Sequence, residues 1–413
     1  MRVSSEKLIF GFFYLFIVFL VFEGPIRYIF AALNANMIVY LPKAFLAFVL
    51  FIYLYMYGRA KKGVWYLLIS LMIFIVIGVF NLGLRQSFFE VWVILPFIYG
   101  LVFSQYIYNE KYYYWYLGLY WLCVAGVLMG LFIHYPWSGL QVDVLGKAVT
   151  ANIEWDAMGI NRDSGFSRAS YSAASQLLCL AVLIIYINKS FLINIAVWFF
   201  SGIGIILTTT KGAFVAWGVL SVYYIMYFLF KSCSVAYIYR SIVIIFFGLL
   251  CVILPVTTLF HSYSGGFQGI IMKFFLSSFM DRLVWMWPDS FHLLEIGRIS
   301  SIYFGRGLGG IGASQSYYEP QYYRAADNVF VYMVVNFGIF VSVLFMAYLT
   351  IRAFSKGDKH QYLFVVPVIM IVFSYGLVVN IFEEPLLSAL VGCILFPYKK
   401  YYEESGGLLL KAR

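Results

Sequence analysis

Charged side chains are scarce in this sequence. Only 11% of the 413 residues are Asp, Glu, Lys or Arg, whereas 63% are apolar, and the mean hydropathy is +0.89. An ordinary soluble domain carries roughly 25% charged residues. The shortage excludes a soluble globular domain and indicates a polytopic membrane protein, whose net charge of +10 is confined to a few polar segments.

Cysteine and histidine are also scarce, which argues against two further classes of protein. The five cysteines nearly all lie within or beside apolar runs and show no CxxC spacing, so we expect neither a disulfide framework nor a zinc site. The four histidines are widely spaced, and no two of them form an i, i+4 ligand pair. We therefore expect no metal and no cofactor, and we expect no nucleic-acid partner.

Long apolar runs predict the secondary structure. Runs of about 20 apolar residues are typical of transmembrane helices. About twelve can be placed, which predicts an all-α polytopic fold with one integral membrane domain over residues 1–413. The predicted helices are 8–22, 38–57, 64–82, 88–107, 114–133, 170–187, 190–207, 213–230, 241–259, 328–350, 361–379 and 385–397. Arg2 and Lys7 precede the first run without a small-residue cleavage site, which predicts a retained helix and not a signal peptide.

The positions of lysine and arginine predict how the chain is oriented in the membrane. Most of these cations fall in short loops and tails on one side of the predicted helices, for example Arg59, Lys61 and Lys62. By the positive-inside rule that side is cytoplasmic and holds both termini. The two long connections, 134–169 and 260–327, are then predicted to face outward.

Arginines also occur in these two long loops, on the side of the membrane where the positive-inside rule predicts few cations. They are Arg162, Arg168, Arg282, Arg298, Arg306 and Arg324. A planar guanidinium with five donors suits phosphate and carboxylate recognition better than the point charge of lysine. For any single arginine the alternative is pairing with a nearby carboxylate, namely Glu154, Asp156, Asp163, Asp281, Asp289, Glu295 or Glu319. Taken together, the arginines predict an anionic ligand at the outer face of the membrane, with lipid phosphates and pyrophosphates as the first candidates.

Three local patterns follow one another through the second half of the chain. They are Leu207-Thr208-Thr209-Thr210-Lys211-Gly212-Ala213; Arg282-Leu283-Val284-Trp285 with Phe304-Gly305-Arg306-Gly307-Leu308-Gly309; and Asp327-Asn328-Val329-Phe330 with Phe337-Gly338-Ile339-Phe340. Their order and their placement relative to the long loops resemble the superfamily of Wzy-type O-antigen polymerases and O-antigen ligases. The first outward loop adds Asn161-Arg162-Asp163-Ser164-Gly165-Phe166-Ser167-Arg168, which is similar to the Arg-x-x-Gly-x-Phe element of that family.

Members of this superfamily join sugar chains at the outer face of the bacterial inner membrane, using undecaprenyl-pyrophosphate donors. The resemblance implies a GT-C-like glycosyltransferase of lipopolysaccharide biosynthesis that transfers a growing glycan to the non-reducing end of a lipid-linked repeat unit, with inversion and without a metal. It implies a periplasmic active site and, as partners, lipid-linked oligosaccharides, the bilayer and a chain-length regulator.

Two positions depart from the common family pattern. Asp327 stands where ligases typically have histidine, which favours a polymerase; ligation to a lipid A core is the alternative. Lys211 stands where the family commonly has arginine, which keeps the charge but loses bidentate geometry and leaves a structural role open.

The resemblance also implies residue roles. The predicted catalytic residues are Arg162, with Arg168 as the alternative for the same role, and Arg282, which would stabilise the departing pyrophosphate. The third predicted catalytic residue, Asp327, would orient or deprotonate the acceptor hydroxyl. Asp327 is explained equally well as the N-cap of a helix that begins at Asn328. The predicted substrate-binding residues are Arg168, Lys211, Arg298, Arg306, Arg324, Gly307, Gly309, Asn328 and Tyr323. The glycines are interpreted as a flexible turn that lets the backbone approach a sugar or phosphate, and the two loops are expected to supply two halves of one site.

Two adjacent carboxylates, Glu383 and Glu384, precede Pro385 unusually close to the membrane. A solvated turn explains them, and contact with sugar hydroxyls or with an arginine is the functional alternative.

Two rival classes remain. A lipid-linked oligosaccharide flippase should line a central cavity within its helices with cations, whereas the cations here cluster in outward loops. A solute transporter should show repeated halves, and we find no convincing internal repeat.

Overall fold

The structure is a computed structural model that describes residues 2–57, 62–144, 147–150, 152–154, 156–157, 160–230, 233–261, 263 and 270–396. Small parts of both predicted outward loops therefore lie outside the described residues, as do the predicted cytoplasmic cations Arg59 and Lys61 and the tail from residue 397 onward.

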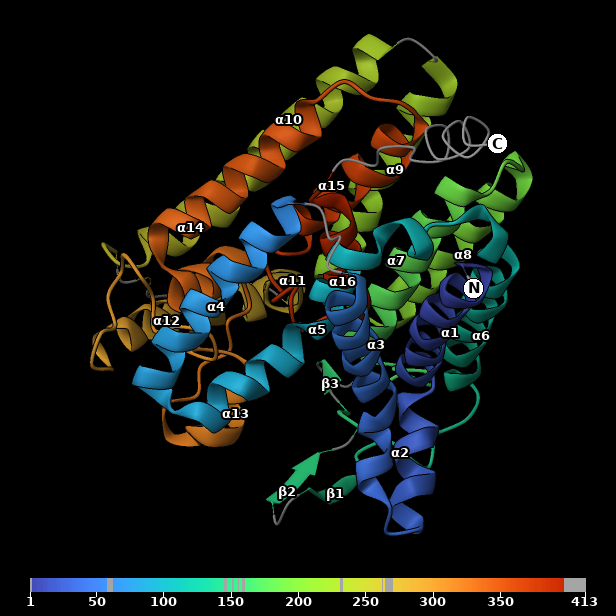
Figure 1. Cartoon of the computed structure of the whole chain (residues 1–413). Coiled ribbons are helices and arrows are strands. Elements are labelled where there is room, and N and C mark those ends of the chain that lie inside the picture. The colour runs from blue at the N-terminus through green and yellow to red at the C-terminus, as the bar shows by residue number, and fades with distance from the viewer. Residues whose placement is uncertain are drawn as a thin grey trace, which may run out of the picture.

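Helices account for most of the described chain (Figure 1). The α-helices are α1 (Arg2–Val21), α2 (Glu23–Ala32), α3 (Leu41–Tyr57), α4 (Lys62–Leu82), α5 (Leu84–Ile107), α6 (Tyr113–Gly130), α7 (Ser170–Ile187), α8 (Phe191–Leu207), α9 (Lys211–Phe230), α10 (Cys233–Thr257), α11 (Ile270–Asp281), α12 (Trp287–His292), α13 (Ala313–Tyr318), α14 (Val329–Phe354), α15 (Val366–Ser374) and α16 (Pro385–Ile394). Two π-helical turns, η3 (Arg282–Met286) and η6 (Gln361–Val365), precede α12 and α15.

A helix lies at each of the twelve segments predicted from apolar runs, and the all-α membrane class is confirmed. Within the described residues, eight helices are long and apolar enough to cross a membrane. The pair α1–α2, bent by 80°, makes a ninth if it counts as one span. The helices α8, η6–α15 and α16 are apolar but shorter than a full span.

Burial separates inner helices from outer ones. The apolar stretch of α7 is 83% buried, whereas those of α4 and α10 are 17% and 22% buried. A helix that is apolar all round and yet exposed on the protein surface needs lipid around it. We infer that α4 and α10 face the bilayer, while α7 belongs to the core together with the largely buried α5, α14, α15 and α16.

Small residues bring α5 and α16 into close contact. A side chain at Gly100 of α5 would collide with the backbone of Ala389, and one at Gly392 of α16 would collide with the backbone of Phe97. Helices inside a membrane gain most of their association from this kind of close packing, because lipid is as apolar as their side chains. The contact fixes the start of α16, and with it the two glutamates that precede Pro385.

The first long loop contains two short antiparallel hairpins, which the sequence does not predict. Strand β1 (Gln141–Val144) pairs with β2 (Lys147–Thr150), with Gln141 opposite Thr150, and β3 (Asp156–Ala157) pairs with β4 (Ile160–Asn161). The loop docks on α2, where the Gly24 amide donates to the Phe166 carbonyl at 2.8 Å. In Figure 1, α2 and the β1–β2 hairpin form the lower end of the molecule.

The glycine-rich run of the second loop is packed into the helices. The Leu308 amide donates to the Phe74 carbonyl of α4 at 2.9 Å, and the amides of Gly309 and Gly310 both donate to Oδ1 of Asn336 in α14, at 3.0 and 2.9 Å. Sequence analysis interprets this run as a flexible turn that approaches substrate. In the structure protein groups occupy its amides, so the run serves to dock the loop.

Gly307 shows why glycine is needed in this run. Its φ is +85°, a conformation that side chains with a Cβ rarely adopt, and a Cβ there would collide with the backbone of Gly78 in α4. The close approach that the glycine permits is therefore to another helix.

Gly307→Ala should destabilise the fold. Placing alanine at positive φ costs about 1–2 kcal/mol, and the collision with α4 adds to this cost. We expect a lower thermal unfolding midpoint in detergent. The matched control is Gly118→Ala on α6, where a Cβ meets nothing within 4 Å and should leave the midpoint unchanged or raise it. Equal midpoints for the two variants would contradict the docking.

Candidate functional site

One cavity lies where the two long loops meet the ends of several helices. Its volume is about 1130 Å³, above the roughly 300–1,000 Å³ usual for small-molecule sites. The polar residues that line it include Glu23, Arg27, Lys43, Arg162, Arg168, Tyr171, Ser172, Thr210, Lys211, Arg282, Tyr323, Asp327, Glu383 and Glu384. Apolar side chains such as Phe16 and Phe247 line other parts. The cavity can accommodate a large ligand with both charged and apolar parts.

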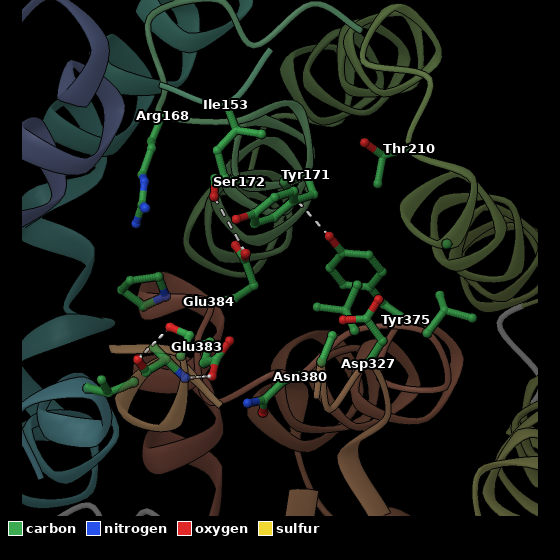
Figure 2. A pocket seen from close by; sticks show the side chains of 18 of the residues that line it. Ile153, Arg168, Tyr171, Ser172, Thr210, Asp327, Tyr375, Asn380, Glu383 and Glu384 are labelled. Atoms are coloured by element: carbon green, nitrogen blue, oxygen red, sulfur yellow. Dashed lines mark hydrogen bonds between the residues drawn. The ribbon is translucent and has the colours of Figure 1, made fainter. Parts of the chain in front are cut away.

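The first loop contributes Arg162 and Arg168. Between them, Oδ1 of Asp163 accepts a hydrogen bond from the Gly165 amide at 2.7 Å, and the Arg168 carbonyl accepts one from the Ile153 amide at 3.0 Å. Figure 2 shows the Arg168 side chain extending into the cavity. Within the described residues its buried Nε has no hydrogen-bond partner. A buried cationic donor without an acceptor is costly, so the site favours an anionic ligand.

Arg282 joins the second loop to the end of α15. It begins the π-helical turn η3, and its Nη1 donates to the Ser278 carbonyl at 2.6 Å. Its Nη2 donates to Oδ2 of Asp327 at 2.7 Å and to the Val378 carbonyl at 3.1 Å. π-Helical turns occur often at functional sites. The guanidinium is held rigidly and is 14% exposed.

Asp327 is an ion-pair partner and not a helix cap. The N-cap of α14 is Asn328, whose Oδ1 accepts from the amides of Phe330 and Val331 at 2.8 and 3.0 Å. The cap interpretation of Asp327 is therefore wrong by one residue. Burial raises the pKa of the Asp327 carboxyl, and the Arg282 guanidinium opposes that rise.

Lys211 lies at the start of α9, after a strained turn. Thr209 has φ +51°, which is unusual for a β-branched residue, and it lines the cavity with Thr210. A Cβ on Gly212 would collide with Val378, so α9 begins close against the turn that follows α15. Lys211 is also within electrostatic reach of Arg162 and Arg282, which repel its charge. Three cations from separate segments thus share one region.

Glu384 is buried and Glu383 is partly buried at the cavity, so the solvated-turn interpretation is wrong. Oε1 of Glu383 accepts from the Ala313 amide at 2.7 Å, and Oε1 of Glu384 accepts from the Ser172 hydroxyl at 3.5 Å (Figure 2). Glu384 is 3% exposed. Burial raises the pKa of each carboxyl to about 8. Repulsion by Glu90 and Asp327 adds to the rise at Glu383, and repulsion by Glu383 adds to the rise at Glu384, while hydrogen bonds oppose both rises.

Several predicted substrate-binding residues lie elsewhere. Arg306 is buried, and it bonds the Ile296 and Gly310 carbonyls and Glu319 at 3.0, 2.8 and 3.2 Å. Arg324 pairs at the surface with Asp289 at 2.8 Å, and Arg298 is exposed. Arg306 and Arg324 thus match the alternative that each arginine pairs within the protein.

The other predicted site residues also fall into two groups, those that pack in the scaffold and those that line the cavity. Gly307 and Gly309 dock the second loop, and Asn328 caps α14, so the structure gives these three residues scaffold tasks. Tyr323 lines the cavity, as do Arg162, Arg168, Lys211, Arg282 and Asp327.

Several residues that line the cavity are absent from the site that the sequence predicts. The adjacent glutamates were a usable signal, because two carboxylates between apolar segments are expensive unless they have a function or a partner. Tyr171, Ser172 and Glu23 carry no such signal, since they belong to ordinary helix starts. No group of three or more His, Cys, Asp or Glu side chains in the described part of the chain is arranged to hold a metal ion.

No family model matches this chain, and neither does any curated protein or solved structure with statistical significance. The fold and its apolar helices define a multi-pass membrane protein.

The buried glutamates should make stability depend on pH. Glutamate titrates near 4.3 in an unfolded chain and at about 8 here, so the folded state binds more protons between these values. Stability should then fall as pH rises through that window and level off above it. The double variant Glu383→Gln/Glu384→Gln should show a shallower fall in its thermal midpoint in detergent. Glu110→Gln, at an exposed site, should keep the wild-type slope; a double variant with that same slope would contradict the burial.

Proposed function

We propose that the protein is a membrane glycosyltransferase of the O-antigen polymerase type. It transfers a growing glycan from undecaprenyl pyrophosphate to the non-reducing end of a lipid-linked repeat unit. The observation that supports this most directly is the cavity itself, where Arg162, Arg168, Lys211 and Arg282 come together from three separate segments. Like charges gathered in one cleft favour a ligand with several negative charges, and a pyrophosphate is such a ligand.

The proposal includes a topology. Twelve crossings in a GT-C-like arrangement place both termini in the cytoplasm of a bacterium and the two long loops in the periplasm. The shorter helices α8, η6–α15 and α16 then complete the spans, with α15 and α16 buried among their neighbours. Both loops contribute to one cavity, which supports a single site at the periplasmic face of the inner membrane.

The proposed reaction needs charge stabilisation above all. The bond between the donor sugar and its pyrophosphate breaks, and the electron pair of that bond leaves on the pyrophosphate oxygen. Arg162, Arg168 and Arg282 donate hydrogen bonds to this developing charge, and Lys211 adds a point charge. Asp327 holds the Arg282 guanidinium in position through the 2.7 Å ion pair. Apolar side chains such as Phe16 and Phe247 are suited to the lipid ends of the substrates.

Arg282→Ala and Arg162→Ala should each reduce glycan extension by about a hundredfold or more, because removing one such donor commonly costs that much. Purified protein with lipid-linked repeat units, followed by analysis of polymer length, measures the effect. Arg298→Ala, at an exposed position outside the cavity lining, is the matched control and should extend normally.

The outcomes separate the alternatives. Normal polymer length in both cavity variants would contradict the proposal. A wild-type protein that leaves repeat units unextended, yet transfers preformed glycan to a lipid A core acceptor, would identify a ligase instead.

A further inference from the structure

The proposed reaction needs a group that accepts the proton of the attacking hydroxyl, and four carboxyls line the cavity. Glu23 is paired with Arg27 at 2.7 Å, which leaves Asp327, Glu383 and Glu384 as candidates. Their surroundings differ enough to distinguish them. The choice among them rests on the proposed function and goes one step beyond it.

Asp327 is already engaged. Its Oδ2 accepts a hydrogen bond from Nη2 of Arg282 at 2.7 Å, and that guanidinium is anchored to the Ser278 and Val378 carbonyls. The Arg282 guanidinium opposes the rise in pKa that burial causes at Asp327, so this carboxylate gains less basicity than its burial alone would give. Accepting a proton would also break the ion pair that positions Arg282. Asp327 is therefore better suited to hold the arginine than to take a proton.

Glu383 is engaged in a different way. Its Oε1 accepts from the Ala313 amide at 2.7 Å, at the first residue of α13, and a Cβ on Gly312 would collide with the same carboxyl. The side chain thus ties α13 to the turn before α16. This hydrogen bond lowers the basicity of the Glu383 carboxylate. The bond also fixes the position of the side chain against α13.

Hydroxyl groups of α7 hold the Glu384 side chain. Its Oε1 accepts a long hydrogen bond from the Ser172 hydroxyl at 3.5 Å, and hydrogen bonding to Ser175 and Ser172 opposes the rise of its pKa. No lysine or arginine in the described residues forms an ion pair with it. The titratable groups that face it are Glu383 in its own turn, Tyr171 and Cys179 of α7, Tyr375 after α15, and Glu23 of α2. None of these five groups is a cation, and the cation that extends into the same part of the cavity is Arg168 of the first loop.

The position of Glu384 suits proton transfer. Figure 2 shows Glu384 and Arg168 extending into the same space from different walls of the cavity. A pyrophosphate bound by Arg168 would bring the donor sugar near this carboxyl. Burial raises the pKa of Glu384 to about 8, which makes its carboxylate a far stronger base than an ordinary glutamate, and general bases work best with a pKa near the operating pH.

We propose that Glu384 is the general base of the transfer, and that Asp327 is a positioning residue for Arg282. The acceptor hydroxyl gives its proton to Oε of Glu384 as its oxygen forms the new bond to the anomeric carbon of the donor sugar. The bond from that carbon to the pyrophosphate oxygen breaks, and the electron pair leaves with the lipid pyrophosphate. Glu384 then releases the proton to water or to the departing pyrophosphate.

The test measures initial rates of extension against pH, using purified full-length protein and lipid-linked repeat units. The wild-type rate should rise with pH as Glu384 loses its proton. Glu384→Gln should lower kcat by about a hundredfold or more, the usual contribution of a general base, with little change in KM, and should abolish the rise with pH. Glu384→Asp should keep a rise with pH at a reduced rate. Glu295→Gln, at an exposed site, should match the wild type.

If Asp327 positions Arg282 and Glu384 is the base, Asp327→Asn should affect KM and leave the pH dependence in place. It should weaken donor binding through Arg282, raise KM for the donor and keep the rise of the rate with pH. A Glu384→Gln protein that elutes as a single species and unfolds at the wild-type temperature or above is folded, so its loss of rate reports on chemistry.

The results test the role of Glu384 separately from the proposed function. An active wild type, with Glu384→Gln equally active and equally dependent on pH, overturns the role of Glu384 and leaves the proposed function standing. Loss of the pH dependence in Asp327→Asn, with its retention in Glu384→Gln, would make Asp327 the base. A folded wild type that extends no lipid-linked repeat unit overturns both the function and the inference.

Discussion

The buried side chain of Asn328 holds together three parts of the chain that meet at the cavity. Its Oδ1 caps the first turn of α14, and its Nδ2 donates to the Cys251 carbonyl of α10 and the Leu377 carbonyl of the turn after α15, at 3.3 and 3.2 Å. One amide thus satisfies helix-end donors and two buried carbonyls that water cannot reach. The residue before it, Asp327, is placed by this arrangement opposite Arg282, so the ion pair depends on the cap.

A second constraint fixes the loop that carries Arg282. The glycine-rich run lies against α4 and against α14 near Gly338, where the φ of +78° interrupts the helix. There the Ile339 amide donates to the Ile302 carbonyl at 2.8 Å, and Asn336 accepts from two amides of the run. The two patterns that resemble the family in this region therefore pack against each other. Their glycines and amides build the scaffold, while Arg282 and Asp327 face the cavity.

The site combines cations with carboxyls in a partly buried region, where each charge strongly affects the pKa of its neighbours. Interactions among charges are stronger where water is excluded, so each group changes the basicity of the next. Asp327 forms an ion pair with Arg282, whereas Glu384 forms no ion pair in the described residues and is bonded by serine hydroxyls of α7. This difference in neighbours, rather than any difference in residue type, separates a positioning carboxylate from a basic one.

Composition and apolar run length alone account for the helices and the membrane class, because lipid selects for local hydrophobicity and each span is set by consecutive residues. Arginines in the two long loops likewise pointed to an anionic ligand, and four of the predicted cations, Arg162, Arg168, Lys211 and Arg282, do line one cavity. Local pattern could not separate them from Arg306, which the fold buries on carbonyls and Glu319. It could not show that Asn328 and not Asp327 caps α14, nor that Glu384 is buried. Those outcomes depend on contacts between residues far apart in sequence, and only packing brings such residues together.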